Sequence, residues 1–268
     1  MTDSPTGHRL DQIRAEGRSA LIGYLPVGFP DVPTSIRAAR LMVEAGVDIV
    51  ELGVPYSDPV MDGPVIQGAV DRALAGGVRV ADTLRAVEAV AAAGAPVLVM
   101  SYWNPVMRYG VAAFARDLAA AGGAGIITPD LIPDEADEWL AASDANGLDR
   151  VFLVAPSSTV ERLALTARSS RGFVYAASTM GVTGTRTSVG THAQQLVEAT
   201  RHAGADHVCV GLGVSDRAQA AEVARFADGV IVGSALVRAL DDPVHSLDPL
   251  RTLVDELAHG VREGGDER

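Results

Sequence analysis

The chain carries the stretch E-L-G-V-P-Y-S-D-P-V-M-D-G-P at residues 51–64. This stretch follows a mostly apolar run, Val47–Val50, that is typical of a buried strand. Its first residue, Glu51, therefore falls at the C-terminal end of a strand, where α/β folds place their chemistry. The loop beyond it contains a second carboxylate, Asp62, and three prolines that fix φ and restrict the residue before each one. We interpret Glu51 and Asp62 as a candidate catalytic pair, held in a fixed relation by a loop with few conformations.

The same order of strand, loop and helix recurs along the 268 residues. Continuous apolar runs of this kind are typical of parallel strands that are covered on both faces. Length and count predict one domain over residues 1–268, a single α/β fold of the closed (β/α)8 TIM-barrel type. An extra N-terminal helix and extra short helices after strands two and eight complete this prediction, and an open sheet of eight parallel strands is the alternative. The predicted strands are Ala20–Pro26, Asp48–Leu52, Pro96–Tyr102, Gly125–Thr128, Arg150–Val154, Phe173–Ala177, His207–Val210 and Gly229–Val232.

Three local predictions concern loops and helix starts. Residues 103–105 (Trp-Asn-Pro) are expected to form a loop after the third strand. Thr191 and Gln194 are expected to form a capping box for a helix over His192–His202. Ser215 is expected to cap the following helix, which runs to about Phe226.

Composition excludes several classes of function. The net charge is −12 and no run of Lys or Arg stands out, which argues against a nucleic-acid partner. No stretch approaches the roughly 18–20 apolar residues of a membrane span, and the first residues contain no hydrophobic signal core. The lone Cys209 lies in an apolar run and fits a reducing compartment, so a cytoplasmic protein is expected. The six histidines are scattered, so no metal site is predicted, and no nucleotide-binding glycine motif is present.

Tyrosines and glycines collect at the predicted C-terminal rim of the barrel. The loops after strands seven and eight commonly hold phosphate in barrels, and Gly211, Gly213, Gly233 and Ser234 fall there. Alternatively, these glycines are only turn residues, Glu51 is a salt-bridged rim residue and Asp62 is a turn residue. Burial of Glu51 would raise its pKa and allow it to exchange protons near neutral pH.

The sequence also resembles the tryptophan synthase α-subunit family over nearly its whole length. The motifs that carry the resemblance are E-L-G-V-P-Y-S-D-P-V-M-D-G-P-V-I-Q at 51–67, G-Y-L-P-V-G-F-P at 23–30, P-D-L-I-P at 129–133, G-V-T-G at 181–184, G-L-G-V-S at 211–215 and G-S-A at 233–235. The resemblance implies a carbon–carbon lyase that cleaves indole-3-glycerol phosphate to indole and glyceraldehyde 3-phosphate. It implies that Glu51 protonates the indole C3 carbon and removes a proton from the glycerol hydroxyl, while Asp62 accepts the ring N–H.

The other site residues follow from the same motifs and from the rim. Tyr175 would position Glu51, and Thr183 would lie over the site when the loop 178–190 closes. Met61, Leu212 and Phe29 depart from the commonest family pattern and leave the shape of the ring pocket open. The expected substrate-binding residues are Tyr24, Met100, Tyr102, Tyr175, Thr183, Gly184, Gly211, Leu212, Gly213, Gly233 and Ser234.

The family resemblance further implies a partner and no cofactor in this chain. The partner is a pyridoxal-phosphate-dependent β subunit in an α2β2 heterotetramer, contacted through rim loops 53–64 and 103–109. Three alternatives stay open from the sequence. They are a phosphate-binding sugar or histidine-pathway isomerase, a barrel kept only as an allosteric partner, and a standalone lyase that releases free indole.

Overall fold

The computed structural model describes residues 4–177, 186–211, 213–241 and 246–265. These residues form one sheet of nine strands, and all of its strand pairs are parallel. The strands are β1 (Ala20–Pro26), β2 (Ile49–Gly53), β3 (Val97–Met100), β4 (Gly125–Ile127), β5 (Asp149–Val151), β6 (Leu153–Val154), β7 (Val174–Ala177), β8 (Val208–Gly211) and β9 (Gly229–Val232).

The order of strands around the sheet confirms the barrel. The order is β5-β4-β3-β2-β1-β9-β8-β7-β6, so the first strand pairs with both the second and the last. An open doubly wound sheet has no such pairing. Only Phe152 separates β5 from β6, and the two therefore occupy the single position of a fifth strand in an eight-position barrel. The predicted strand over Arg150–Val154 is thus interrupted at its middle.

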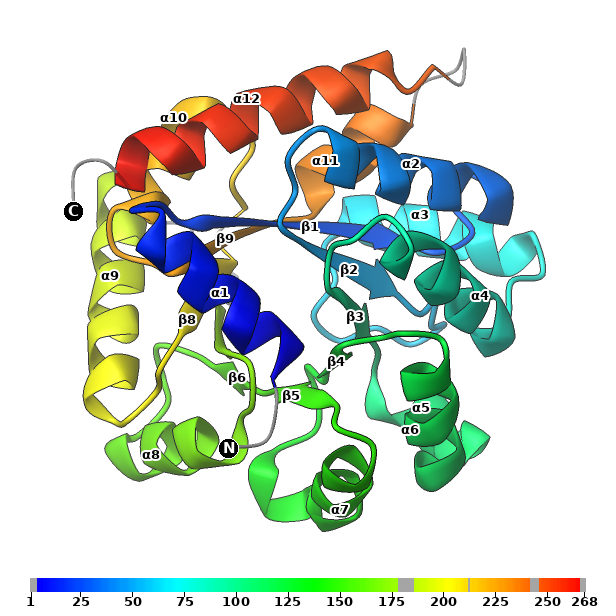
Figure 1. Cartoon of the computed structure of the whole chain (residues 1–268), viewed down its shortest axis with the longest axis horizontal. Helices are drawn as coiled ribbons and strands as arrows, with labels where there is room; N and C mark the ends of the chain where they lie inside the picture. Colours follow the sequence, from blue (N-terminus) through cyan, green and yellow to red (C-terminus); the bar gives the residue numbers. More distant parts are fainter. Residues whose placement is uncertain (1–3, 178–185, 212, 242–245, 266–268) are drawn as a thin grey trace.

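Helices surround the barrel in an outer ring (Figure 1). The extra N-terminal helix and the additional helices after the second and last strands are present as predicted. The helices of the described residues are α1 (Pro5–Ala15), α2 (Val32–Glu44), α3 (Pro64–Ala75), α4 (Val80–Ala91), α5 (Trp103–Tyr109), α6 (Val111–Ala120), α7 (Asp137–Ala145), α8 (Val160–Ser169), α9 (Arg186–His202), α10 (Arg217–Ala224), α11 (Ser234–Leu240) and α12 (Asp248–Gly265), with a 3-10 turn η1 (Pro133–Glu135) before α7.

Two buried apolar layers hold the barrel together. The larger one lies between the strands and the outer helices and is built mainly from Val, Leu and Ala. The smaller one fills the barrel interior, where Ile22, Ile49, Leu98 and Ile231 meet. Because successive side chains of a strand point to opposite faces, residues two apart along β1 and β2 enter this interior together. Tyr24 and Glu51 pair in register on these strands and lie one step further toward the C-terminal ends.

Helix α1 closes the N-terminal end of the barrel and crosses it in Figure 1. Leu10 and Ile13 on its inner face belong to the interior layer. Its Thr6 donates to the buried carboxylate of Asp149 at the start of β5, through both its amide (2.9 Å) and its hydroxyl (2.5 Å). The opposite end of the barrel is consequently the one left for a functional site.

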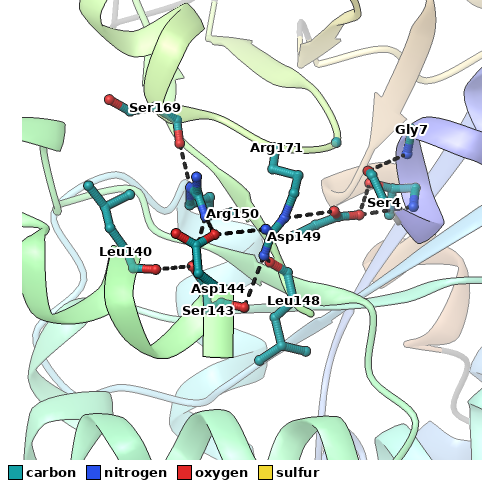
Figure 2. Close-up of polar contacts among 12 residues, drawn as sticks. Ser4, Gly7, Leu140, Ser143, Asp144, Leu148, Asp149, Arg150, Ser169 and Arg171 are labelled. Atoms are coloured by element: carbon teal, nitrogen blue, oxygen red, sulfur yellow. Dashed lines mark hydrogen bonds and ion pairs between the residues drawn. The ribbon is translucent and has the colours of Figure 1, made fainter. Parts of the chain in front are cut away.

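A polar network continues from Asp149 along the outside of β5 (Figure 2). Arg171 lies 3.7 Å from Asp149 Oδ1 and donates to Asp144 at 2.8 Å. Arg150 donates to the same Asp144 oxygen at 2.5 Å and to the carbonyl of Ser169 at 2.7 Å. The network links the N-terminal segment, β5 and the C-terminal ends of α7 and α8.

Three local predictions about loops and helix starts are wrong. Residues 103–105 open helix α5 rather than a loop, because Asp130 accepts the amide of Trp103 at 2.9 Å. Pro105 is tolerated since it falls in the first turn, where amides have no partner within the helix. Helix α9 already begins at Arg186, so Thr191 lies inside it and is not its cap. Asp216, not Ser215, caps α10 by accepting the amide of Gln219.

Candidate active site

A cavity of about 230 Å³ opens at the C-terminal ends of the strands. It brings together the two predicted acids, two of the predicted tyrosines and most of the predicted glycines. Its lining residues are Tyr24, Glu51, Met61, Asp62, Gly63, Ile66, Met100, Leu153, Tyr175, Ala177, Gly211, Gly213, Ile231, Gly233 and Ser234.

Glu51 is the buried acid of this cavity. Strand β2 places it in the barrel interior beside Tyr24 of β1, and its side chain is 1% exposed. Its Oε1 atom has no hydrogen-bond partner among the described residues. Burial without a compensating charge raises the pKa of Glu51 from 4.5 to about 8. The carboxyl is therefore protonated at neutral pH and can both give and take back a proton.

Asp62 is the half-buried acid on the loop between β2 and α3. Its Oδ1 accepts a hydrogen bond of 3.2 Å from the hydroxyl of Tyr102, which follows β3. The same hydroxyl accepts the amide of Met61 at 3.0 Å. Burial raises the pKa of Asp62, and the bond from Tyr102 opposes that shift by favouring the anion. Tyr102 thus acts on the site through the acid loop, because it is not among the cavity-lining residues.

Two tyrosines stand in the cavity wall beside glycines that leave room for them. A Cβ atom on Gly53 would come within 2.8 Å of ring atoms of Tyr24, and a Cβ atom on Gly211 within 2.8 Å of ring atoms of Tyr175. Burial raises the pKa of both tyrosines far above the ordinary value, with the charge of Glu51 adding to the shift. Both hydroxyls stay neutral and available as hydrogen-bond donors.

The predicted anion-binding residues Gly213, Gly233 and Ser234 line the same cavity. Gly213 has a φ of +69°, which L side chains rarely adopt, and a Cβ atom there would meet open space. Its glycine requirement is therefore conformational, whereas that of Gly211 is steric. Ser234 is the first residue of α11, directly after β9.

Sequence reasoning missed several cavity residues. Leu153 and Ile231 lie on strands, and nothing in a continuous apolar run marks which residues face a cavity. Ile66 lies on α3, and Ala177 ends β7. Gly63 flanks Asp62 and lines the cavity together with Met61, which the sequence had already connected with the shape of the ring pocket. The predicted residues Thr183, Gly184 and Leu212 lie outside the described residues.

Two larger hollows lie at the N-terminal end of the barrel, where α1 packs. Neither contains Glu51, Asp62 or the glycine loops, so the smaller cavity is the better candidate for chemistry. Among the residues that the structure describes, no group of three or more His, Cys, Asp or Glu side chains could hold a metal ion. Within that same part of the chain, every helix is too short or too polar to cross a bilayer.

The fold and this cavity define a (β/α)8-barrel enzyme with its acids at the C-terminal rim. The sequence profile of the family "Tryptophan synthase alpha chain" matches residues 10–262. A tryptophan synthase alpha chain from Mycobacterium marinum is 65% identical over 260 residues, which cover 97% of this chain and 96% of that protein. The chain belongs to the tryptophan synthase alpha chain family.

Solved structures agree with that assignment. The aminoacrylate-bound crystal structure of tryptophan synthase from M. tuberculosis contains a chain with a TM-score of 0.90 and 60% identity, which covers 97% of this chain and 100% of that one. A crystal structure of the tryptophan synthase alpha subunit from Legionella pneumophila has a TM-score of 0.88 at 30% identity and covers 99% of this chain and 100% of that one. The barrel geometry is thus shared with relatives of much lower sequence identity.

Proposed function

We propose that the chain cleaves indole-3-glycerol phosphate to indole and glyceraldehyde 3-phosphate, the α-reaction of tryptophan synthase, by carboxylate acid–base catalysis. One observation supports this mechanism most directly. Glu51 is a fully buried carboxyl with an unpartnered oxygen and a pKa near 8, and it shares a cavity with a second acid. The reaction needs one group that can donate a proton to carbon and accept one from oxygen.

In the proposed mechanism Glu51 carries out both proton transfers and Asp62 stabilises the charge that forms between them. Protonated Glu51 gives its proton to indole C3, which leaves a positive charge on the ring and its N–H. Asp62 accepts that N–H and stabilises the charge. The Glu51 carboxylate then takes the proton of the glycerol hydroxyl on the carbon attached to C3. The bond between the two carbons breaks, its electron pair returns to the ring, and the oxygen becomes the aldehyde carbonyl of glyceraldehyde 3-phosphate. Glu51 ends protonated, as it began.

The remaining lining residues suit the other parts of the substrate. We assign the phosphate to Gly213, Gly233 and Ser234, because they follow β8 and β9, where barrels commonly bind phosphate. We assign the indole ring to the apolar wall formed by Met100 and Leu153 across the cavity. In this arrangement Tyr175 packs beside Glu51 and limits the positions that its carboxyl can take.

A pyridoxal-phosphate-dependent β subunit is the partner we propose for the rim. Among the residues that the structure describes, the exposed large apolar side chains are Val60, Met61, Met107, Ile132 and Val160. All of them follow β2, β3, β4 or β6 at the C-terminal end of the barrel. An apolar product leaving the cavity toward such a surface favours direct transfer to a second protein. The α2β2 assembly and the absence of a cofactor from this chain are parts of the same proposal.

We also propose that the whole chain is one domain and that it resides in the cytoplasm. All nine strands belong to one continuous parallel sheet that runs from β5 round to β6. Cys209 is buried and unpaired, in keeping with a reducing compartment.

The direct test is to incubate the purified chain with indole-3-glycerol phosphate and measure indole release, with and without a family β subunit. Glu51→Gln should lower turnover by roughly 10²–10⁴-fold, because the proton relay is lost while shape is kept. The matched control is Asp58→Asn, an exposed acid on the same loop whose carboxylate accepts a hydrogen bond from the neighbouring Ser57 hydroxyl. Indole release that needs no β subunit would indicate a standalone lyase, and full turnover in Glu51→Gln would disprove the assigned role.

A further inference from the structure

A second hollow, of about 410 Å³, lies against the proposed active-site cavity. The two share three lining residues: Met61, Leu153 and Ala177. The rest of the second hollow comes from the end of β6, from the loops after β4 and β6 and from the start of α8, and its apolar contributors include Ile132. These three residues therefore form the wall between two spaces.

Met61 is the part of this wall that can be removed without disturbing the barrel. Leu153 belongs to β6 and pairs in register with Tyr175, and Ala177 ends β7 with only a methyl group to lose. Met61 lies on the loop that precedes α3, and its side chain is 36% exposed. Its amide is held at 3.0 Å by the Tyr102 hydroxyl, so its backbone position is fixed while its long unbranched side chain can adapt.

The second hollow extends the cavity on the ring side. The proposed phosphate residues Gly213, Gly233 and Ser234 follow β8 and β9, and none of them lines the second hollow. The shared wall includes Leu153, which we assigned to the indole ring. Space gained through this wall would therefore be next to the ring and away from the phosphate.

We propose that Met61 sets the size of the aromatic ring that this site accepts, by closing the cavity against the neighbouring hollow. This inference rests on the proposed cleavage of indole-3-glycerol phosphate. Removing the thioether side chain joins the two spaces and admits substrates with substituents on the benzo ring. Met61 is thus a specificity-determining residue and takes no part in the proton transfers.

The test compares Met61→Ala with the unsubstituted chain on a series of substrates. The series is indole-3-glycerol phosphate and its derivatives with a methyl, chloro or benzyloxy group at each benzo position. The quantity measured is kcat/KM for each derivative divided by kcat/KM for the parent substrate. We expect this ratio to rise on the order of tenfold or more for a substituent at one position, because hydrophobic pockets discriminate added carbon groups by such factors.

Two further variants identify the source of the gain. Ala155 lines only the second hollow, so adding Ala155→Leu to Met61→Ala should refill that space and reverse the gain. Ile132→Ala enlarges the second hollow without opening the wall and should leave the ratio unchanged. If Met61→Ala does not fold, Met61→Val shortens the same side chain and should raise the ratio for the smaller substituents.

The possible results distinguish a failure of the Met61 inference from a failure of the proposed function. If the unsubstituted chain releases no indole from the parent substrate, the proposed function fails. If it cleaves the parent but Met61→Ala and Met61→Val leave every ratio unchanged, Met61 does not set ring size. A gain that survives Ala155→Leu would likewise overturn the proposal, since the gain would then come from somewhere other than the second hollow.

Discussion

The hydroxyl of Tyr102 lies 3.2 Å from Oδ1 of Asp62 and 3.0 Å from the amide nitrogen of Met61. One side chain just beyond β3 therefore holds the loop after β2 in position and favours the anionic form of its acid. Removing that hydroxyl should act on Asp62 without touching the barrel core.

Tyr102→Phe should lower kcat/KM by roughly ten- to a hundredfold, the range expected when a hydrogen bond to a charged group is lost. The bond from Tyr102 favours the Asp62 anion, so the pKa of Asp62 should rise in the variant. The site uses Asp62 as an anion, and the acidic limb of the kcat/KM–pH profile should therefore move to higher pH.

Tyr56→Phe is the matched control for this substitution. The Tyr56 ring stacks 5.4 Å from that of Tyr102, and its hydroxyl accepts from Asn104 rather than bonding to Asp62. The control should leave the acidic limb in place. A uniform loss of rate at all pH values in Tyr102→Phe would show that the hydroxyl only holds the loop in place.

The raised pKa of Glu51 leads to a separate prediction about the alkaline limb of the pH profile. Its burial raises the pKa to about 8, and the first proposed step needs the protonated form. Turnover should thus fall as pH rises through about 8, and kcat/KM measured from pH 6 to 10 would show the limb. If the alkaline limb is absent, the loss of the Glu51 proton does not limit turnover. The same conclusion holds if the limb persists in the residual activity of Glu51→Gln.

The same raised pKa makes folding stability depend on pH. In the native state Glu51 holds its proton up to about pH 8, whereas the unfolded chain releases it near 4.5, so the native state binds more protons between these values. The stability that depends on this proton is complete below about 4.5 and is lost as pH rises to about 8. Glu51→Gln should remove that loss, on the order of 5 kcal/mol in full. Urea unfolding of the unsubstituted chain and of Glu51→Gln at pH 5 and 8.5 measures this loss. If the difference in unfolding free energy between the two proteins is the same at both pH values, titration of Glu51 is not the cause.

The sequence predicts the barrel and the two acids because their signals are local. Glu51 follows an apolar strand directly, and Asp62 belongs to the same proline-rich loop. The contact between Tyr102 and Asp62 joins residues 40 positions apart, and only the barrel closure brings them together. Helix α5 was not predicted for a related reason. The amide of its first residue, Trp103, donates to Asp130, which lies on the neighbouring loop and is distant in sequence.

Gly211 shows how a correct residue can be predicted for an incomplete reason. Its motif suggested close approach of an anion to the backbone, and it does line the cavity. The structure adds a steric requirement, because Tyr175 of β7 occupies the space that a Cβ atom would take. That requirement depends on the register between β7 and β8, which pairs Tyr175 with Cys209 and Ala177 with Gly211 and which no single strand sequence contains.

The polar network around Asp149 at the start of β5 should be important for the stability of the fold rather than for catalysis. Asp149 is fully buried and accepts two hydrogen bonds from Thr6. Arg171 lies beside Asp149 (Figure 2). Asp149→Ala should lower the free energy of unfolding by roughly 3–5 kcal/mol, because it leaves the buried amide and hydroxyl of Thr6 without an acceptor, at about 1–3 kcal/mol each. Asp144→Asn, at an exposed carboxylate of the same network, should cost about 1 kcal/mol or less. Denaturant unfolding gives both values, and an equal cost for the two would show that burial of Asp149 is not what matters.

Gly211→Ala should destabilise the protein through Tyr175 alone. The added methyl group would collide with the Tyr175 ring, and such overpacking costs roughly 1–3 kcal/mol. Tyr175→Ala removes the obstacle, so in that background Gly211→Ala should cost little. Gly213→Ala is the matched contrast, because Gly213 has a φ of +69°. The substitution should cost about 1–2 kcal/mol through backbone strain. Tyr175→Ala cannot relieve that strain. Denaturant unfolding of the unsubstituted chain, the three single variants and the two double variants gives the two coupling energies. A coupling between positions 211 and 175 no larger than that between 213 and 175 would show that Gly211 is required for its backbone and not for the room it leaves.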